Sequence, residues 1–526
     1  MNKLDSFLKT LATDETADAV PVVRELVKAK TEGLPLRPFQ EDALAHALVW
    51  RRSLMGLEMG LGKTAIAISA LHSATNAGLR PSLVVVPPSL RTNWLREFED
   101  FAPELTVHTI RGRTPYELPD VDVFISGDAN MNEDWANTLK GHIQGLVIDE
   151  GHRMKNYKTQ RAQAVMSIAR GIPSDGIIMP MSGTFTTNGR PTELVTSLQI
   201  INRMSDLVTG KKDAKWSMGH QDSFLNRYAP RIDSWGGRGA DHLVELNEKL
   251  VEHAGYYRKL RDDVLAGTED ELPNKGRSLW YAEGAPKKAI KRYELAEEDL
   301  RAYLMGERGY SEAQVEKSYR AEALTRLNTL RREAGLLKIE ATVARAKELL
   351  TESADDERVF IATGFRQEAD LIAERMSGKD VQVVKIVGGM SDKAKTASVD
   401  AFTEGDARVL VGNINASGVG FTLHGGGKCR HMILHSMNFV PADLLQVEDR
   451  LHRFGQTREC ISTIAIATLP SGVPTIDEHI YDILEAKYGG LSEILDGIED
   501  RKLIGNLEGS VIDELLNVYK SDNYIS

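Results

Sequence analysis

The chain has 526 residues, enough for roughly three or four domains, and its 42% hydrophobic and 27% charged residues are typical of a globular protein. No apolar run approaches the roughly 20 residues that a membrane helix needs, and two cysteines are too few for a disulfide framework or a cysteine zinc site. The net charge of −11 argues against a largely basic surface but does not exclude a local basic groove for nucleic acid.

The first 34 residues predict an N-terminal helical segment, because apolar residues recur there at helical spacing. They contain no long apolar stretch of the secretory type, so we expect a cytosolic protein that is not held in a membrane. An amphipathic helix is predicted next, with Gln40 near its start. The Gln40 amide could read an adenine by donating and accepting at once, although a surface glutamine is the simpler interpretation of this residue alone.

The segment Gly56–Thr64 reads GLEMGLGKT and lies between an apolar stretch and a predicted helix. Glycines let the backbone approach a phosphate, a lysine adds a cation and a threonine offers a hydroxyl to magnesium. The residues with these roles are Gly60, Gly62, Lys63 and Thr64. They predict a nucleoside triphosphate site. A Gly-rich turn beside a solvated lysine is the alternative, because Leu57 stands where the usual pattern has a small residue.

Strands and helices alternate over residues 35–200, which predicts an α/β domain with a parallel sheet covered on both faces. Strands are predicted at 83–87, 121–126, 146–148 and 177–181, and a helix at 89–101. In such folds the functional residues gather where the strands end. The third of these strands ends in Asp149-Glu150-Gly151-His152.

Two adjacent carboxylates at the end of an apolar strand are difficult to explain as core, because unpaired buried charge is costly. We expect Asp149 to belong to the magnesium shell and Glu150 to orient and deprotonate the attacking water. His152 would link the site to neighbouring groups. A solvated strand end is the alternative.

Residues 201–345 break the alternation and predict a helical insertion between two domains. Its basic clusters, such as Arg258-Lys259-Arg261, are mixed with acidic residues, which favours solvated helix faces over nucleic-acid contacts for most of them. Trp216, Trp235 and Trp280 could form a wedge between nucleic-acid strands, but packing in a core is the favoured interpretation.

Residues 346–485 alternate again and predict a second α/β domain, which has no phosphate loop and would complete the first domain's site across a cleft. Its strands are predicted at 359–362, 381–387, 408–411, 431–434 and 461–467, with helices at 366–376 and 393–402. The tail, residues 486–526, is acidic and predicts a helical brace that packs across both domains.

Arg450 and Arg453 lie in the segment Gln446–Gln456 and are three residues apart, a spacing that places both on one face of a helix. Two neighbouring guanidinium groups can grip a transferring phosphoryl group. Given a separate triphosphate loop and a carboxylate pair, we favour arginine fingers over ordinary salt bridges.

Together these segments resemble the superfamily-two helicases and translocases, and more closely their Swi/Snf-like branch, with a DEAH-type carboxylate box. The resemblance extends over roughly residues 34–470, in the family's order. It is carried by Leu36–Gln40, Glu58–Thr64, Asn93-Trp94, Asp149–His152, Ser182–Thr184, Arg227-Tyr228, Asp263–Leu265 with Leu272-Pro273, Ala416–Gly420 and Gln446–Gln456. The sequence departs from the family pattern at Leu57, Gly151, Phe185 and Phe454, but none of these departures removes a charged catalytic group.

The resemblance implies two RecA-like domains that bind ATP and Mg²⁺, with nucleic acid along another edge. Gln40 would contact adenine, Gly418 would join the nucleotide site, and Lys63 and Thr64 would contact phosphate and magnesium. Coupling between the ATP state and the nucleic acid is implied for Ser182, Thr184 and Gln446. Contacts with the nucleic-acid backbone are implied for Ser89, Arg366, Asn415 and Ser417.

The leading hypothesis is an ATP-dependent motor that moves along duplex or branched DNA and remodels or anneals DNA structures. A strand-separating helicase on DNA or RNA and a nucleotide-gated interaction switch are the alternatives. Neither zinc nor a membrane is expected as a partner, and a compact bacterial or viral member of the family would suit the length.

Overall fold

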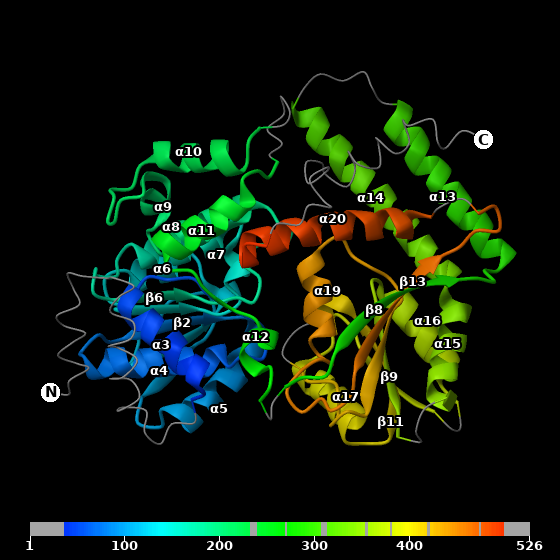
Figure 1. Cartoon of the computed structure of the whole chain (residues 1–526), viewed down its shortest axis with the longest axis horizontal. Helices are drawn as coiled ribbons and strands as arrows, with labels where there is room; N and C mark the ends of the chain where they lie inside the picture. Colours follow the sequence, from blue (N-terminus) through cyan, green and yellow to red (C-terminus); the bar gives the residue numbers. More distant parts are fainter. Residues whose placement is uncertain are drawn as a thin grey trace. The chain divides into compact units, whose positions relative to one another are not determined.

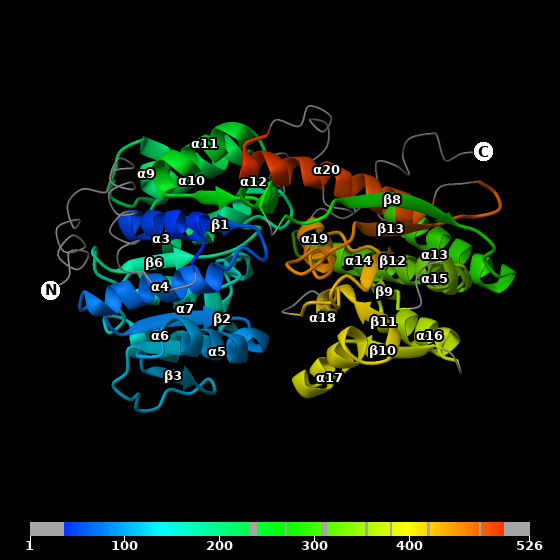
Figure 2. The ribbon, with the colours of Figure 1, turned by 60° about the horizontal axis from the view of Figure 1, so that its bottom comes forward.

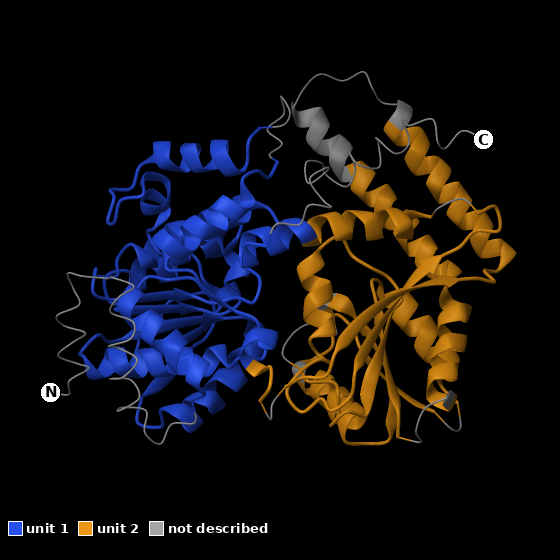
Figure 3. Ribbon diagram, viewed as in Figure 1, with its two compact units in different colours: residues 1–232, 238–264, 489–502 blue, residues 233–237, 265–488, 503–526 orange. Residues whose placement is uncertain are grey.

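The computed structural model describes residues 36–231, 239–268, 271–306, 313–352, 356–378, 381–417, 421–472 and 475–498. The predictions for the N-terminal segment, Trp235, Gly418 and the end of the tail lie outside these ranges. The described chain forms two compact units (Figure 3). Unit 1 contains residues 36–231, 239–264 and 489–498, and unit 2 contains the described residues from 265 to 488.

Unit 1 is built on a five-stranded sheet in the order β3-β4-β2-β5-β6, and every neighbouring pair of strands is parallel. Strands β2 and β6 of this sheet are labelled in Figure 1. The strands are β2 (Ser82–Val86), β3 (Val107–Ile110), β4 (Val123–Gly127), β5 (Gly145–Ile148) and β6 (Ile177–Pro180). A separate parallel pair joins β1 (Met55–Leu57) to β7 (Tyr257–Lys259). Strands β2, β4, β5 and β6 are buried along their whole length, as their runs of Val and Ile predict for a sheet covered on both faces.

Helices α3 (Pro38–Trp50), α4 (Lys63–Asn76) and α5 (Arg91–Phe101) share one apolar core with alternate residues of the unit 1 strands. Further helices complete the unit: α6 (Glu133–Leu139), α7 (Gln160–Ala169), α8 (Val195–Ile200), α9 (Met204–Thr209), α10 (Met218–Tyr228) and α11 (Leu243–Ala254). Because the strands are parallel, the loops that follow β1, β2, β5 and β6 meet at one edge of the unit.

Unit 2 has a six-stranded sheet in the order β10-β11-β9-β12-β13-β8, again parallel throughout. The strands are β8 (Lys275–Ala282), β9 (Arg358–Thr363), β10 (Gln382–Ile386), β11 (Ala407–Asn413), β12 (Cys429–Leu434) and β13 (Cys460–Ala467). The helices are α13 (Lys287–Gly306), α14 (Ala313–Leu337), α15 (Ile339–Glu352), α16 (Arg366–Met376), α17 (Asp392–Thr403), α18 (Ile414–Ser417), α19 (Pro441–Glu448) and the first part of α20 (Ile476–Asp496). The short helix α12 (Arg261–Leu265) lies at the division between the units.

The predicted fold class, α/β with two parallel-sheet domains, is confirmed, but the separate helical insertion over residues 201–345 is wrong. Residues 201–264 pack with unit 1, whereas β8 pairs with β13 at the edge of the second sheet (Figure 2). The apolar stripes of α13 and α14 join the core of that sheet, with Tyr293 and Leu330 in the same cluster as Phe360. Helical periodicity identified these helices but carries no information about which sheet they cover.

Among the described residues, no helix is both long and apolar enough to cross a membrane.

Candidate active site

The predicted phosphate loop connects β1 to α4, as the sequence indicates. Gly60 and Gly62 have φ values of 85° and 71°, in the left-handed region that glycine adopts without a side-chain clash. Gly62 is the N-cap of α4, so the first-turn N–H groups of this helix face the loop. Lys63 Nζ donates hydrogen bonds to the carbonyl oxygens of Leu57 at 2.9 Å and Glu58 at 3.2 Å. The lysine therefore points back across its own loop.

Gln40 packs against this loop and is not a surface residue, because it is only 8% exposed. Its Nε2 donates to the Leu61 carbonyl at 3.1 Å, and its Oε1 accepts from the Arg37 backbone N–H at 2.8 Å. A side chain at position 62 would displace the Gln40 amide from its present place. The contact of Gln40 with adenine stays a prediction.

Glu58 of the loop is held by Arg261, a contact that sequence reasoning missed. Arg261 Nη2 donates to Glu58 Oε1 at 2.6 Å, and the Arg261 backbone N–H donates to Oε2 at 2.8 Å. Arg261 is 2% exposed, although its mixed-charge neighbourhood predicts a solvated helix face. This charged pair fixes the start of the phosphate loop on the β7–α12 segment.

Asp149 lies at the end of β5 and accepts a hydrogen bond from Trp94 Nε1 at 2.9 Å. Burial and the neighbouring Glu150 carboxylate raise the pKa of Asp149 to about 6, while the indole N–H and the Lys63 ammonium oppose this rise. The charge of Lys63 therefore acts on Asp149, as expected for one phosphate and magnesium site. Trp94 belongs to the Asn93-Trp94 segment, but its bond to the carboxylate was not predicted.

A further carboxylate, Glu97, was also missed. On α5 it lies one turn after Trp94, accepts from Asn93 Nδ2 at 2.6 Å and accepts from the Thr64 hydroxyl. Burial raises the pKa of Glu97, and the Asp149 charge adds to this rise. Thr64, Asp149 and Glu97 thus bring oxygen atoms close together beside Lys63. Oxygen ligands are the donor set that Mg²⁺ prefers, so these residues fit a magnesium nucleotide.

Glu150 begins a chain of polar contacts that leads away from this site. Its backbone has φ 51°, a strained value for a side chain of this size, and its Oε2 lies 3.3 Å from His152 Nδ1. His152 Nδ1 also lies 3.0 Å from Ser182 Oγ. Ser182 Oγ donates to the Thr184 carbonyl at 2.9 Å and accepts from the Thr184 N–H at 3.1 Å. Because the Ser182 hydrogen is used in this way, the network assigns a hydrogen to His152 Nδ1.

Arg258 joins two segments of the site through backbone carbonyl groups. Its Nη1 donates to the carbonyl oxygens of Gly56 and Gly183, each at 2.8 Å, and its Nε pairs with Asp496 at 2.7 Å. Gly56 opens the phosphate-loop segment and Gly183 is the centre of Ser182–Thr184. Arg258 is therefore an exception to the solvated faces predicted for most of these basic clusters. Its long-range partners give no signal in the local sequence.

In unit 2, Arg450 and Arg453 come together, but not on a helical face. Helix α19 ends at Glu448, and both arginines lie in the turns that follow it. Arg450 Nη1 and Arg453 Nη1 donate to the same acceptor, the Phe421 carbonyl, at 3.3 and 3.4 Å. A tight turn, with the Arg450 N–H bonded to the Val447 carbonyl, replaces the expected helix.

The remaining predicted residues follow strand ends. Ser89 is exposed after β2, and Arg366 is exposed at the start of α16 after β9, where it lies 3.8 Å from Asp370. Gln446 is half-buried on α19. Asn415 and Ser417 belong to the backbone of α18 after β11, but their side chains, like Gly418, lie outside the described part of the structure.

Comparison with known proteins gives two family matches. An SNF2-related domain matches residues 27–202, and a helicase conserved C-terminal domain matches residues 341–455. One similar protein is from Xenopus tropicalis and is named SWI/SNF-related matrix-associated actin-dependent regulator of chromatin subfamily A-like protein 1. The two sequences are 27% identical over an alignment that covers 88% of this chain and 45% of the Xenopus protein. Another similar protein is the Homo sapiens DNA annealing helicase and endonuclease ZRANB3. It is 25% identical over an alignment that covers 93% of this chain and 42% of the human protein.

A solved structure, the Sulfolobus solfataricus SWI2/SNF2 ATPase core in complex with dsDNA, is similar at 21% identity with a TM-score of 0.39, over 88% of this chain and 92% of that one. The chain spans less than half the length of the two relatives named above.

Proposed function

We propose that this chain is a nucleic-acid-dependent ATPase of the Swi/Snf-like branch of the superfamily-two helicases and translocases, and that it moves along duplex DNA and remodels or anneals DNA structures. The observation that carries the proposal is the continuous path from Glu150 through His152 and Ser182 to Thr184. Such a path lets a change at the catalytic carboxylate alter the Ser182–Thr184 segment.

Bound ATP with Mg²⁺ supplies the phosphoryl group whose transfer to water drives the cycle. Lys63 would exchange the Leu57 and Glu58 carbonyl oxygens for phosphate oxygens. Thr64 and Asp149 would hold the metal ion, and Glu150 would take the proton of the attacking water. Arg450 and Arg453 would neutralise the charge that develops on the phosphoryl group.

Ser89, Arg366, Asn415 and Ser417 are the proposed contacts with the DNA backbone. Contacts with phosphate groups do not depend on the base sequence. A motor that steps along DNA needs such contacts, because they are the same at every position. Ser89 and Arg366 are both exposed, which supports this part of the proposal.

The test is steady-state ATP hydrolysis at one fixed low salt concentration, without nucleic acid and with duplex DNA, single-stranded DNA or RNA. We expect the strongest stimulation by duplex DNA, followed by triplex displacement in a translocation assay. Stronger stimulation by a single strand or by RNA would favour a strand-separating helicase. High turnover without stimulation would favour a nucleotide-gated switch.

Two variants test the assigned residues in the same assay. Lys63→Ala should fold and lose turnover, and Glu150→Gln should bind ATP without hydrolysing it. Lys158→Ala is the matched control, because Lys158 is exposed and lies over the neighbouring Tyr157 ring. Normal turnover in either site variant would reject the assignment.

A further inference from the structure

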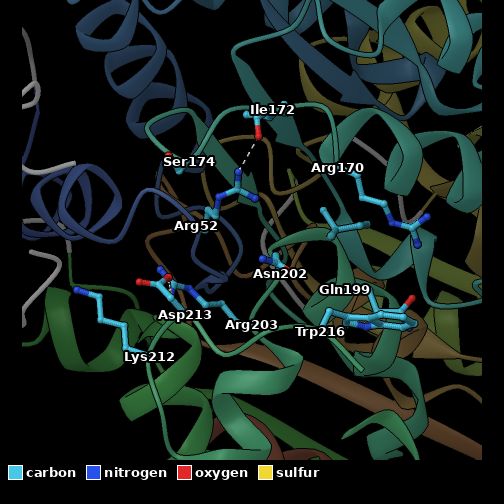
Figure 4. Close-up of a pocket in the computed structure, with 11 residues that line it drawn as sticks. Arg52, Arg170, Ile172, Ser174, Gln199, Asn202, Arg203, Lys212, Asp213 and Trp216 are labelled. Atoms are coloured by element: carbon cyan, nitrogen blue, oxygen red, sulfur yellow. Dashed lines mark hydrogen bonds and ion pairs between the residues drawn. The ribbon is translucent and has the colours of Figure 1, made fainter. Parts of the chain in front are cut away.

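A cavity of about 650 Å³ opens in unit 1 away from the candidate active site (Figure 4). Its lining includes Arg52, just before β1, and Ile172 and Ser174, just before β6. Other lining residues are Gln199 and Asn202, around the end of α8, and Trp216 between α9 and α10. The phosphate loop and Ser182–Thr184 follow the same two strands, so the cavity lies at the opposite edge of the sheet.

The lining is mainly positively charged. It contains one acidic residue, Asp213, and four basic residues, Arg52, Arg170, Arg203 and Lys212. Arg203 pairs with Asp206 at 2.9 Å and Asp213 at 3.6 Å, so its charge is largely compensated. Arg52 is fixed in place by donating to the Ile172 and Pro173 carbonyl oxygens at 2.9 Å. Arg170 is exposed, and within the described ranges its guanidinium donates no hydrogen bond and forms no ion pair. The Arg170 guanidinium is therefore the cationic group that the described lining offers to an anion.

Trp216 supplies a flat apolar surface to the same cavity. It is 46% exposed, so the core position favoured for it by sequence is wrong. Figure 4 shows the indole beside Gln199, at the side of the cavity away from Lys212. The neutral side chains Ser174, Gln199 and Asn202 can each donate and accept hydrogen bonds.

We propose that this cavity binds a nucleotidyl group, with the base against the Trp216 indole and the phosphate against the Arg170 guanidinium on the same side of the cavity (Figure 4). An acidic peptide would pair with the cationic group, but it has no aromatic ring to stack on the indole. A nucleobase can stack on the indole and can form hydrogen bonds through its polar edge with the neutral side chains. The volume lies in the usual range of small-molecule sites and is too small for a duplex. A free nucleotide and the end of a single strand share this chemistry.

The experiment measures binding of dTMP and of 5′-phosphorylated tetrathymidylate by calorimetry, with the candidate active site saturated by a non-hydrolysable ATP analogue and Mg²⁺. Arg170→Ala and Trp216→Ala should each weaken binding by roughly 5- to 100-fold. Trp216→Phe, which keeps an aromatic plane, should retain most of the affinity. Tyr157→Ala is the matched control, since Tyr157 is an aromatic residue of similar exposure, 43%, outside the cavity.

Similar affinity for both probes would assign the site to a free nucleotide, and much tighter binding of the tetranucleotide would assign it to a strand end. The proposal is overturned if neither probe binds, if the cavity variants bind as well as Tyr157→Ala, or if an oligoglutamate peptide competes with equal affinity. None of these residues belongs to the ATPase site, so DNA-stimulated hydrolysis should persist in the variants and each proposal can fail alone.

Discussion

At the Asp149 carboxylate, burial and a like charge disfavour ionisation while one indole N–H and one ammonium group favour it. The balance leaves a pKa of about 6, within the range in which an enzyme is assayed. Removing one favourable contact should therefore be visible in a pH profile, because a magnesium-binding carboxylate has to be ionised.

Trp94→Phe removes the donor to Asp149 and keeps an aromatic ring beside Phe98. The charged carboxylate loses a hydrogen bond, so its pKa rises and the acid limb of kcat/KM against pH should move to higher pH by up to about one unit. Trp135→Phe is the control, since Trp135 is equally buried and donates to the Gly112 carbonyl. An unshifted limb in Trp94→Phe would contradict the role of the indole.

Glu97→Ala leaves the Thr64 hydroxyl and the Asn93 amide without their common acceptor. We expect the Mg²⁺ concentration that gives half-maximal ATP hydrolysis to rise by about 3- to 10-fold, corresponding to one hydrogen bond. The measurement is a magnesium titration at saturating ATP. Glu99→Ala, on the exposed side of the same helix, should titrate like the unmodified protein. If the magnesium titration curves of Glu97→Ala and Glu99→Ala are the same, Glu97 does not contribute to the magnesium site.

The residues with a known short pattern could be predicted because their roles depend on neighbours in the chain. Lys63, Asp149, Glu150 and His152 are of this kind. The roles of Trp94 and Glu97 depend on which face α5 turns toward the end of β5, which is decided by tertiary packing. Their spacing of three residues on one helical face, soon after β2, is the signal that was available.

At the scale of elements, Arg258 holds two loops and the last part of α20 through three acceptor atoms, the Gly56 and Gly183 carbonyl oxygens and Asp496 Oδ1. Local sequence predicted several helices and most strands correctly because apolar periodicity is a local property. It placed Arg258 and Arg261 on solvated faces because their partners, from Gly56 to Asp496, are remote in the chain. The same limit applies to Arg450 and Arg453, which a turn brings together after α19 has ended.

Arg258→Ala should lower the free energy of unfolding of unit 1 by roughly 2–4 kcal/mol, because it leaves the mostly buried Asp496 carboxylate without its cation. Urea unfolding followed by tryptophan fluorescence measures the change. Arg227→Ala breaks the exposed pair with Glu245 and should leave the urea midpoint almost unchanged, because solvent screens an exposed ion pair. Equal losses in the two variants would show that the Arg258 contacts contribute no more than a surface pair.

In unit 2, Glu368 near the start of α16 accepts hydrogen bonds from the Gly364 and Phe365 N–H groups and from Ser436 Oγ. Burial raises the pKa of Glu368 from 4.5 to about 7, against the opposing effects of these bonds and of the Lys338 charge. The folded protein therefore keeps a proton that the unfolded chain releases. The stabilisation is fully present below pH 4.5 and is lost as the pH rises through about 7.

Glu368→Gln carries no titrating group, so it should not lose this stabilisation. Between pH 5 and 8 the unmodified protein should become less stable relative to the variant by roughly 2–3 kcal/mol. Urea midpoints at several pH values measure the difference. Glu374→Gln, on the exposed side of the same helix, is the control. A difference between Glu368→Gln and the unmodified protein that does not change with pH would contradict the raised pKa.

At the scale of the whole molecule, the two parallel sheets could be predicted from alternating strands and helices. The division of the chain between them could not be predicted. Unit 1 takes residues 489–498 from the end of the described chain, and unit 2 begins at residue 265, far before the boundary expected at 346. Packing of the tail across both domains stays a prediction.

Deleting residues 489–526 should destabilise unit 1, because Asn247 Nδ2 donates to the Ile494 and Leu495 carbonyl oxygens and Arg258 pairs with Asp496. Hydrogen exchange should increase in β5 and β6 more than in β9 and β11. Deleting only residues 499–526 keeps all three contacts and serves as the control. Uniform exchange in both units after the longer deletion would contradict the assignment of these residues to unit 1.

The return of the chain to unit 1 has a consequence for synthesis on the ribosome. Residues 36–264 are translated before residues 265–488 of unit 2, and the segment that contains Asp496 follows only after them. At roughly 5–20 residues per second, that interval lasts on the order of ten to forty seconds. Unit 1 is therefore translated in two parts, and during that interval it lacks the segment 489–498 and the Arg258–Asp496 pair.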